Sequence, residues 1–385
     1  MIRVHQRRGS ALVVTLWVLA ALIILAAGLG LTARTEIRIA RNYTERIKCR
    51  WAARAAIEAA LLRLKEADDL SLSVLTGGEN GVVLTSEELE LNMGEAGFTI
   101  VIEDESGRVN VNTASAEMLE NIFGDSEAAD SIIDWRDADD ISRASGAETE
   151  YYSTLERPYR ARNASLLAVG ELHLIKGIPE RLSSSTNNTT GLVPIEIFTV
   201  YSRDRNINAA GQKRVNILAA ERNTLTALLS DILDDSKINA LMQFISAGNL
   251  REVADIVGVA ELSREDIKGI YDRLTLSNAE EIEGLININT VSAAVLAAVP
   301  GLDEGMAERI MAYRTENGPF NDVGALLDIS DIPLAVFREI APLFTARSSI
   351  YRLTASGFIR DGRPFIITCV VDMDGGTPRI LYWQE

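Results

Sequence analysis

An apolar run from Ser10 to Leu31 constrains the fold of this chain more than any other feature. No charged residue occurs between Arg8 and Arg34, and about 20 apolar residues are needed for an α-helix to cross a bilayer. A secretory signal peptide is the alternative, but its apolar core is shorter and ends at a small-residue cleavage site. Beyond Leu31 no proline or glycine occurs as far as Lys65. We therefore expect one helix from Ser10 to Lys65, roughly 80 Å long.

The outer half of this helix carries an apolar stripe. Six residues recur at helical spacing within an arc of roughly 100°, the width of a face that packs on a core: Ile39, Tyr43, Ile47, Ile57, Leu61 and Leu64. This half is predicted to support a folded domain. A signal-anchor helix that simply continues into a domain is the plainer interpretation of the same pattern.

Strand signals flank a long helical interlude. Alternating β-branched residues predict strands at Val82–Leu84 and Gly97–Glu103 before it, and at Ser349–Ile359, Arg363–Asp372 and Arg379–Trp383 after it. Gly-containing turns separate the last three, as in hairpins. The sequence thus predicts an α+β fold: the long helix packs on a small antiparallel sheet, and an all-α block is inserted between the first and second strands of that sheet.

The inserted block contains a duplication. The stretch from Val109 to Leu119 (VNVNTASAEML) matches Ile286 to Leu296 (ININTVSAAVL), and later segments of the two copies match as well. A fainter echo of the first segment begins at Val215. The Asn-Thr pairs suggest that Thr113 and Thr290 cap the helices that follow, because a hydroxyl can accept from free N–H groups there.

Each copy resembles a helix-hairpin-helix or SAM-like unit, as at Pro300-Gly301 followed by a helix. DNA-binding versions use hairpin amides and nearby cations, and phosphate binding depends on cationic groups. Residues 284–345 carry eight Asp and Glu against three Arg and no Lys. Protein–protein packing is therefore the favoured role, with DNA binding as the alternative.

The first copy has an extra acidic segment of about 24 residues between Arg136 and Val169. Clustered carboxylates around a turn suit Ca²⁺, which takes six to eight oxygen ligands, although the EF-hand spacing is absent. A solvated acidic loop explains the composition equally well. The candidate ligands are Asp137, Asp139 and Glu148, followed by Asp134, Asp140 and Glu150.

Several classes of function lack support. Only His5 and His173 are present, too few for a multi-histidine metal centre, and neither G-x-S-x-G nor H-E-x-x-H occurs, so no enzyme is predicted. The net charge of −17 disfavours attraction to nucleic acid. Cys49 and Cys369 are expected to be buried thiols, because a helix and a packed strand seldom approach within disulfide reach.

The residues before the apolar run resemble the leader of the type IV pilin class. A basic segment ends in Gly9 directly before Ser10, where a prepilin peptidase cuts and the new N-terminus is methylated. The fifth mature residue is Val14 instead of the usual Glu, which is typical of pseudopilin K of type II secretion. The stretch from Asp134 to Tyr152 resembles the calcium-binding helical domain of that family, and the resemblance covers essentially the whole chain.

This resemblance implies a noncatalytic minor pseudopilin, anchored by one span in the inner membrane with a cytoplasmic N-terminus and most of the chain periplasmic. Its partners would be other minor pseudopilins and secretion proteins, its cofactor calcium, and its position the fibre tip. A membrane-anchored DNA receptor of a competence system is the alternative. The predicted divisions are a leader (1–9), pilin helix and first strands (10–104), a first SAM-like unit with the acidic insert (105–205), a second unit (206–346) and closing strands (347–385).

Overall fold

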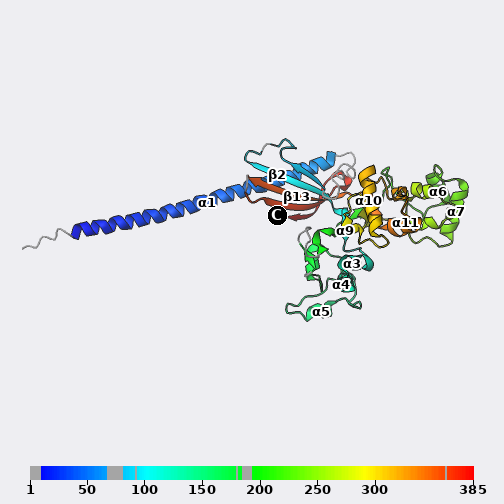
Figure 1. Cartoon of the computed structure of the whole chain (residues 1–385), viewed down its shortest axis with the longest axis horizontal. Helices are drawn as coiled ribbons and strands as arrows, with labels where there is room; N and C mark the ends of the chain where they lie inside the picture. The colour runs from blue at the N-terminus through cyan, green and yellow to red at the C-terminus, as the bar shows by residue number, and fades with distance from the viewer. Residues whose placement is uncertain (1–9, 67–80, 92, 179–180, 184–192, 360–361) are drawn as a thin grey trace, which may run out of the picture.

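The computed structural model describes the chain except residues 1–9, 67–80, 92, 179–180, 184–192 and 360–361. It is elongated: a protruding helix leads into a sheet, and the helical units lie beyond the sheet (Figure 1). Helix α1 spans Ser10–Glu66, so the predicted continuous helix is confirmed. Of the described helices, α1 is the one long and apolar enough to cross a membrane.

Five antiparallel strands form the head sheet, in the order β1-β2-β13-β14-β15. Their bounds are β1 Val82–Thr85, β2 Ala96–Asp104, β13 Ile350–Ile359, β14 Phe365–Asp372 and β15 Arg379–Gln384. All five were predicted within two residues at each end. The helical block enters after β2 and returns into β13, between the second and third strands. The prediction of an insertion after the first strand was wrong, because short β1 joins the sheet as an edge strand beside β2.

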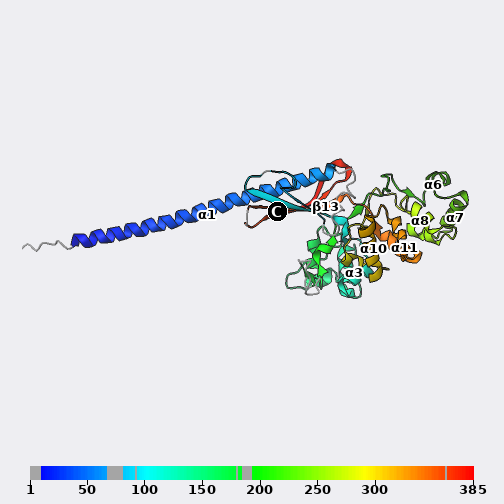
Figure 2. The same ribbon diagram turned by 45° about the horizontal axis from the view of Figure 1, so that its top comes forward.

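The outer half of α1 lies along one face of this sheet (Figure 2). Ala53, Ile57 and Leu64 are buried there with apolar residues of β2, β13 and β14. The helix and sheet approach so closely that a Cβ at Gly357 of β13 would lie 1.9 Å from the carbonyl oxygen of Cys49. A glycine at this crossing is therefore a packing requirement.

The predicted stripe on α1 is covered by the head only in part. Ile57 and Leu64 are buried, whereas Ile39 and Tyr43 remain 63% and 67% exposed. The expectation was wrong for this lower part, since burial of α1 by the head begins at Cys49. Before that residue the head touches α1 only through a few side chains, such as Arg46 over the ring of Phe365. Cys49 and Cys369 are both free and buried, which confirms the expected thiols.

Three units follow one another in the helical block, each closed by a short parallel strand pair. We name them the first unit (109–199), closed by β3 and β6; the second unit (215–275), closed by β8 and β9; and the third unit (286–345), closed by β11 and β12. The strand bounds are β3 Val109–Asn110, β6 Phe198–Thr199, β8 Val215–Asn216, β9 Leu274–Thr275, β11 Ile286–Asn287 and β12 Phe344–Thr345. The faint echo at Val215 thus begins a unit of its own, and the range 206–346 holds two units.

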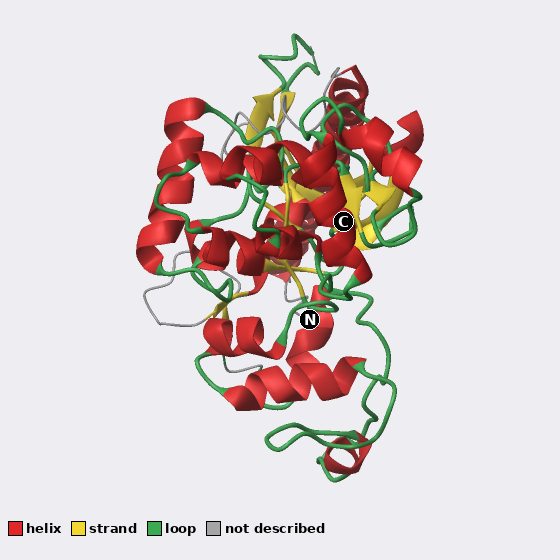
Figure 3. Ribbon diagram, turned by 90° about the vertical axis from the view of Figure 1, so that its right-hand side faces the viewer, coloured by secondary structure: helices red, strands yellow, loops and turns green. Residues whose placement is uncertain are grey.

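Figure 3 shows the helices of these units. Their buried apolar side chains form one continuous cluster. Their bounds are α3 Ala116–Phe123, α4 Ser126–Arg136 and α5 Thr149–Ser153; α6 Arg222–Leu229, α7 Asp235–Ser246 and α8 Arg264–Tyr271; α9 Ala293–Leu296, α10 Glu304–Asn317 and α11 Leu334–Ile340. The helices after the Asn-Thr pairs are capped by Ser115 and Ser292, whose hydroxyls accept from the third backbone N–H. The prediction of threonine caps was wrong, since helix geometry favours the serine two positions later.

Two adjacent carboxylates at the end of β2 join the head to the units. Glu105 is buried and accepts hydrogen bonds from Arg352 of β13, at 2.6 and 2.8 Å, and from Thr199 of the first unit, at 2.8 Å. Asp104 accepts from Asn287 of the third unit at 2.6 Å. Burial raises the pKa of Asp104, whereas the nearby arginines lower the pKa of Glu105 against its burial. The head is therefore tied to two units at once.

Candidate metal site

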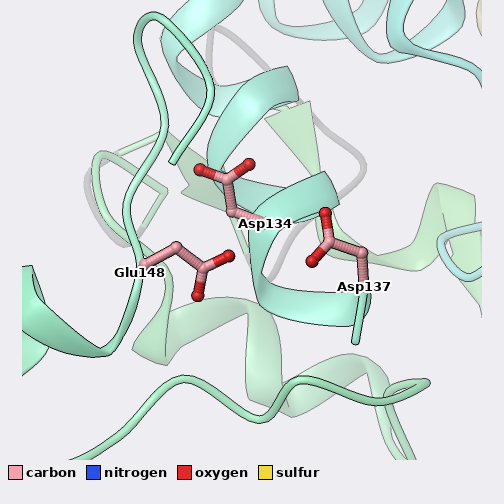
Figure 4. A group of neighbouring side chains, drawn as sticks. All are labelled: Asp134, Asp137 and Glu148. Atoms are coloured by element: carbon pink, nitrogen blue, oxygen red, sulfur yellow. The ribbon is translucent and has the colours of Figure 1, made fainter. Parts of the chain in front are cut away.

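The acidic segment of the first unit folds against the end of α4. Asp134 lies in the last turn of α4, Asp137 directly follows that helix, and Glu148 precedes α5. Figure 4 shows the three side chains gathered at the end of α4, and one carboxylate oxygen of each lies within 4.8 Å of those of the other two. Helical spacing from Asp134 to Asp137 places two of them on one side, and the returning loop brings Glu148 to meet them.

Two of the three carboxylates are removed from water. Asp134 is fully buried and Glu148 is 2% exposed, while Asp137 is partly buried. Both carboxylate oxygens of Glu148 are buried without a hydrogen-bond partner in the described structure. Buried polar atoms are usually hydrogen-bonded, so an unpaired carboxylate here needs a ligand to account for it.

The electrostatics of the cluster agree with this need. Burial, followed by the negative charges of Asp134 and Asp137, raises the pKa of Glu148 to about 7. Burial also raises the pKa of Asp134, opposed by a hydrogen bond from the backbone N–H of Arg143. A bound divalent cation would lower the pKa of both carboxyl groups again, because its positive charge compensates their desolvation and their mutual repulsion.

The loop between α4 and α5 is held by other contacts. The backbone N–H of Ser145 donates to Asp130 at 3.0 Å. A Cβ at Gly146 would lie 2.0 Å from a carboxylate oxygen of Asp134, so only glycine fits there. Of these residues, Asp130 was missed in the sequence. The signal was present, since Asp130, Asp134 and Asp137 recur at helical spacing on one face.

The remaining predicted ligands lie outside the cluster. Asp139 is exposed and accepts from the backbone N–H of Ile141 at 2.8 Å. Asp140 is exposed and accepts from Asn163 at 3.0 Å, and Glu150 is exposed on α5. The structure thus brings together Asp134, Asp137 and Glu148, and leaves Asp139, Asp140 and Glu150 apart. The sequence analysis put Asp139 among its first three candidate ligands, whereas in the structure Asp134 lies beside Asp137 and Glu148.

The three carboxylates fit a hard cation. They can supply up to six oxygens, the lower limit of the coordination number of Ca²⁺, and the set contains no nitrogen or sulfur donor. Below the site, Trp135 and Tyr152 meet edge to face with ring centroids 5.1 Å apart, and Tyr152 stacks on Tyr159. This aromatic support fixes α4 and α5 relative to each other and so positions the carboxylates.

Comparison with known proteins finds a family whose sequence model matches the region that contains this site. The sequence model of the family described as type II secretion system, protein K, matches residues 103–187, and that of a helix-hairpin-helix motif matches residues 282–345. Type II secretion system protein K of Aeromonas hydrophila is 24% identical over 246 residues, covering 56% of this chain and 71% of that protein. Its counterpart in Pectobacterium carotovorum is 25% identical over 241 residues, covering 56% and 70%. The solved GspK-GspI-GspJ complex of enterotoxigenic Escherichia coli aligns at TM-score 0.47 and 12% identity, over 91% of this chain and 98% of the other.

Proposed function

The chain belongs to the protein K family of type II secretion systems, and we propose that it is a noncatalytic minor pseudopilin at the tip of a periplasmic pseudopilus. The supporting observation is the position of the three units, at the end of the head opposite the apolar part of α1 (Figure 1). In a fibre whose subunits align their apolar helices, that bulk occupies the space in which a further subunit would stack.

The apolar part of α1 supports the same position. In the type IV pilin class, most subunits carry Glu at the position of Val14, and that Glu neutralises the N-terminal amine of a neighbour. An unpaired charge at membrane depth is costly. A neutral residue at this position suits a subunit that has no neighbour above it to supply the amine.

Cysteine crosslinking in assembled fibres tests the tip position. Both native cysteines are buried, so an introduced surface cysteine dominates the reaction. Gln243→Cys places a thiol on exposed α7 of the second unit, and Lys48→Cys places one on exposed α1 below the head. We expect crosslinks to other pseudopilins from the Lys48 position and none from the Gln243 position. Crosslinks to major subunits from both positions would put the chain in the shaft.

We further propose that α1 anchors the protein in the inner membrane with its N-terminus cytoplasmic, after cleavage between Gly9 and Ser10 and methylation of Ser10. Gly9 lies outside the described residues, and α1 begins at Ser10. Mass spectrometry of protein from a host with the cognate peptidase should find a mature chain that starts at Ser10. An intact Met1, or a cut between residues 26 and 33, would contradict processing of the pilin type.

The proposed cofactor is Ca²⁺, held by Asp134, Asp137 and Glu148. What supports it is the unpaired buried carboxylate of Glu148 among two other acidic groups. When bound, the ion supplies charge compensation and joins α4 to the start of α5. Its role is thus to stabilise the first unit, which the partners of the protein, proposed to be other minor pseudopilins, would meet as one rigid surface.

One observation supports the alternative of DNA binding: residues 282–345 match the sequence model of a helix-hairpin-helix motif. In the third unit, however, the side chain of Glu339 lies against the hairpin glycine, since a Cβ at Gly301 would come within 2.7 Å of its carboxyl carbon. A carboxylate beside the hairpin repels a phosphate. We expect no shift of duplex DNA in a gel at physiological salt, and a shift would revive the alternative.

A further inference from the structure

Two arginines lie on one face of α1 directly beyond its apolar run. Arg34 and Arg38 are four residues apart, so their side chains leave the helix on the same side. Both are exposed, and within the described part of the chain neither has an ion pair or a side-chain hydrogen bond. Unpaired cations are unexpected in a chain whose net charge is −17.

Two other basic residues on the same face of α1 form ion pairs within the protein. Arg41 forms a 2.8 Å ion pair with Glu45 one turn further, and Lys48 lies 3.5 Å from Glu95 of the head. The basic residues nearer the head therefore find partners in the protein. Within this described stretch of the face, Arg34 and Arg38 are the basic residues without a partner in the protein. Their partner must therefore be another molecule.

The distance of Arg34 and Arg38 from the apolar run along the helix axis indicates what their partner is. Arg34 is three residues and Arg38 seven residues beyond Leu31, which is about 4.5 Å and about 10 Å along the axis. Headgroups extend roughly 5–7 Å beyond each side of the hydrocarbon core. Because helical side chains lean toward the N-terminus and long cationic ones reach along the helix, both guanidinium groups can enter the headgroup layer.

Among the described residues, no other polar group on this face of α1 is free to bind a ligand at the depth of the headgroup layer. The hydroxyl of Thr32 donates to the carbonyl oxygen of Gly28, and that of Thr35 donates to the carbonyl oxygen of Leu31. Glu36 projects from the opposite side of the helix, two residues from Arg34. The recognition surface thus consists of two guanidinium groups, which suit a phosphate because each can donate two parallel hydrogen bonds.

We propose that Arg34 and Arg38 form a binding site for the phosphate of an anionic phospholipid. The site fixes the depth of α1 in the bilayer, and thereby the height at which the head, beginning at Cys49, stands above the membrane. This inference depends on the anchoring of α1 and not on the place of the protein in a fibre, so each can fail without the other.

Native mass spectrometry of the full-length chain in neutral detergent tests the site. The wild type is mixed with equal amounts of phosphatidylglycerol and phosphatidylcholine, and should retain phosphatidylglycerol preferentially. A basic residue near a membrane surface contributes roughly a factor of five in affinity, so the double variant Arg34→Gln/Arg38→Gln should lose about 30-fold. Arg63→Gln is the matched control: it removes an exposed arginine of the same helix, far beyond the apolar run, and should retain the lipid.

Four outcomes would overturn the proposal. One is equal retention of the two lipids by the wild type. The second is unchanged retention of phosphatidylglycerol by the double variant, and the third is an equal loss in the Arg63 control. The fourth is displacement of the lipid by inorganic phosphate at a matching concentration, which would make free phosphate the ligand. An unchanged melting curve of the double variant verifies folding, because neither arginine contacts the core.

Discussion

Replacing Glu148 with Gln should make the calcium-free protein more stable above neutral pH. Burial and the charges of Asp134 and Asp137 raise the pKa of Glu148 from 4.5 to about 7. Each pKa unit corresponds to about 1.4 kcal/mol, so the ionised carboxylate lowers the free energy of unfolding by about 3 kcal/mol. Gln keeps the shape of the side chain and removes that charge.

The pH dependence follows from the same shift. The unfolded chain releases the proton of Glu148 near pH 4.5, and the calcium-free folded chain releases it near pH 7. Between these values the unfolded state binds fewer protons, so stability falls as pH rises and levels off above pH 7. The variant should lack this decline. At about pH 5, where folded Glu148 is protonated, the two proteins should be nearly equal in this respect.

Calcium should reverse the order of the two proteins. An ion that binds only the folded state adds about 4.1 kcal/mol at a thousandfold excess over Kd, which exceeds the loss of about 3 kcal/mol in the calcium-free wild type. Unfolding of the full-length chain in detergent, followed by circular dichroism with calcium or chelator at pH 5 and pH 8, should show this gain in the wild type and not in Glu148→Gln. Glu150→Gln is the control, because this exposed residue lies outside the cluster and should leave both responses intact.

Three results would refute the reasoning. If Glu148→Gln in chelator at pH 8 is no more stable than the wild type, the buried carboxylates do not destabilise the calcium-free fold. If calcium stabilises the variant as much as the wild type, the ion binds elsewhere. Identical wild-type curves with calcium and with chelator would leave the segment a solvated acidic loop.

Three further predictions concern the head. Gly357→Ala should destabilise the protein by about 1–3 kcal/mol in denaturant unfolding, because its Cβ would collide with the backbone of Cys49, whereas Gly170→Ala, with open space around it, should have little effect. Glu105→Gln should cost about 1–3 kcal/mol at neutral pH, because it removes the charge that pairs with partly buried Arg352, while Arg108 keeps its ion pair with Glu103. Since the folded pKa of Glu105 is lowered, the difference from wild type should shrink as pH falls below 4.5, as pH-dependent unfolding can measure. Cys369, whose pKa burial raises to about 12, should react with a thiol reagent only after unfolding.

Features that repeat over long stretches of sequence were predictable. The apolar run and the absence of helix breakers set α1 within one residue of its observed end. Alternation of β-branched residues set the strands of the head, and the matching Asn-containing segments set the start of the first and third units. Each of these signals depends on local periodicity, which backbone geometry converts directly into structure.

Features that depend on tertiary contact were predicted poorly. The sequence could not show that burial of α1 begins only at Cys49, so it assigned Ile39 to a covered face. The order of the candidate ligands, with Asp139 ahead of Asp134, could not include the path of the loop. That loop returns at Gly146, brings Glu148 to Asp134 and leaves Asp139 exposed.

The topology explains how a small head carries so large an insert. The block leaves from the end of β2 and returns at the start of β13, and these strands are paired there, with Asp104 opposite Tyr351. Each unit repeats the arrangement, because its first and last strands pair in parallel and so lie about 4.8 Å apart. A unit with adjacent ends can be inserted or duplicated without displacing the strands around it. The loop between α4 and α5 obeys the same rule within the first unit: it leaves at Asp137 and returns at Glu148, beside its own start, so a bound cation would close the last gap.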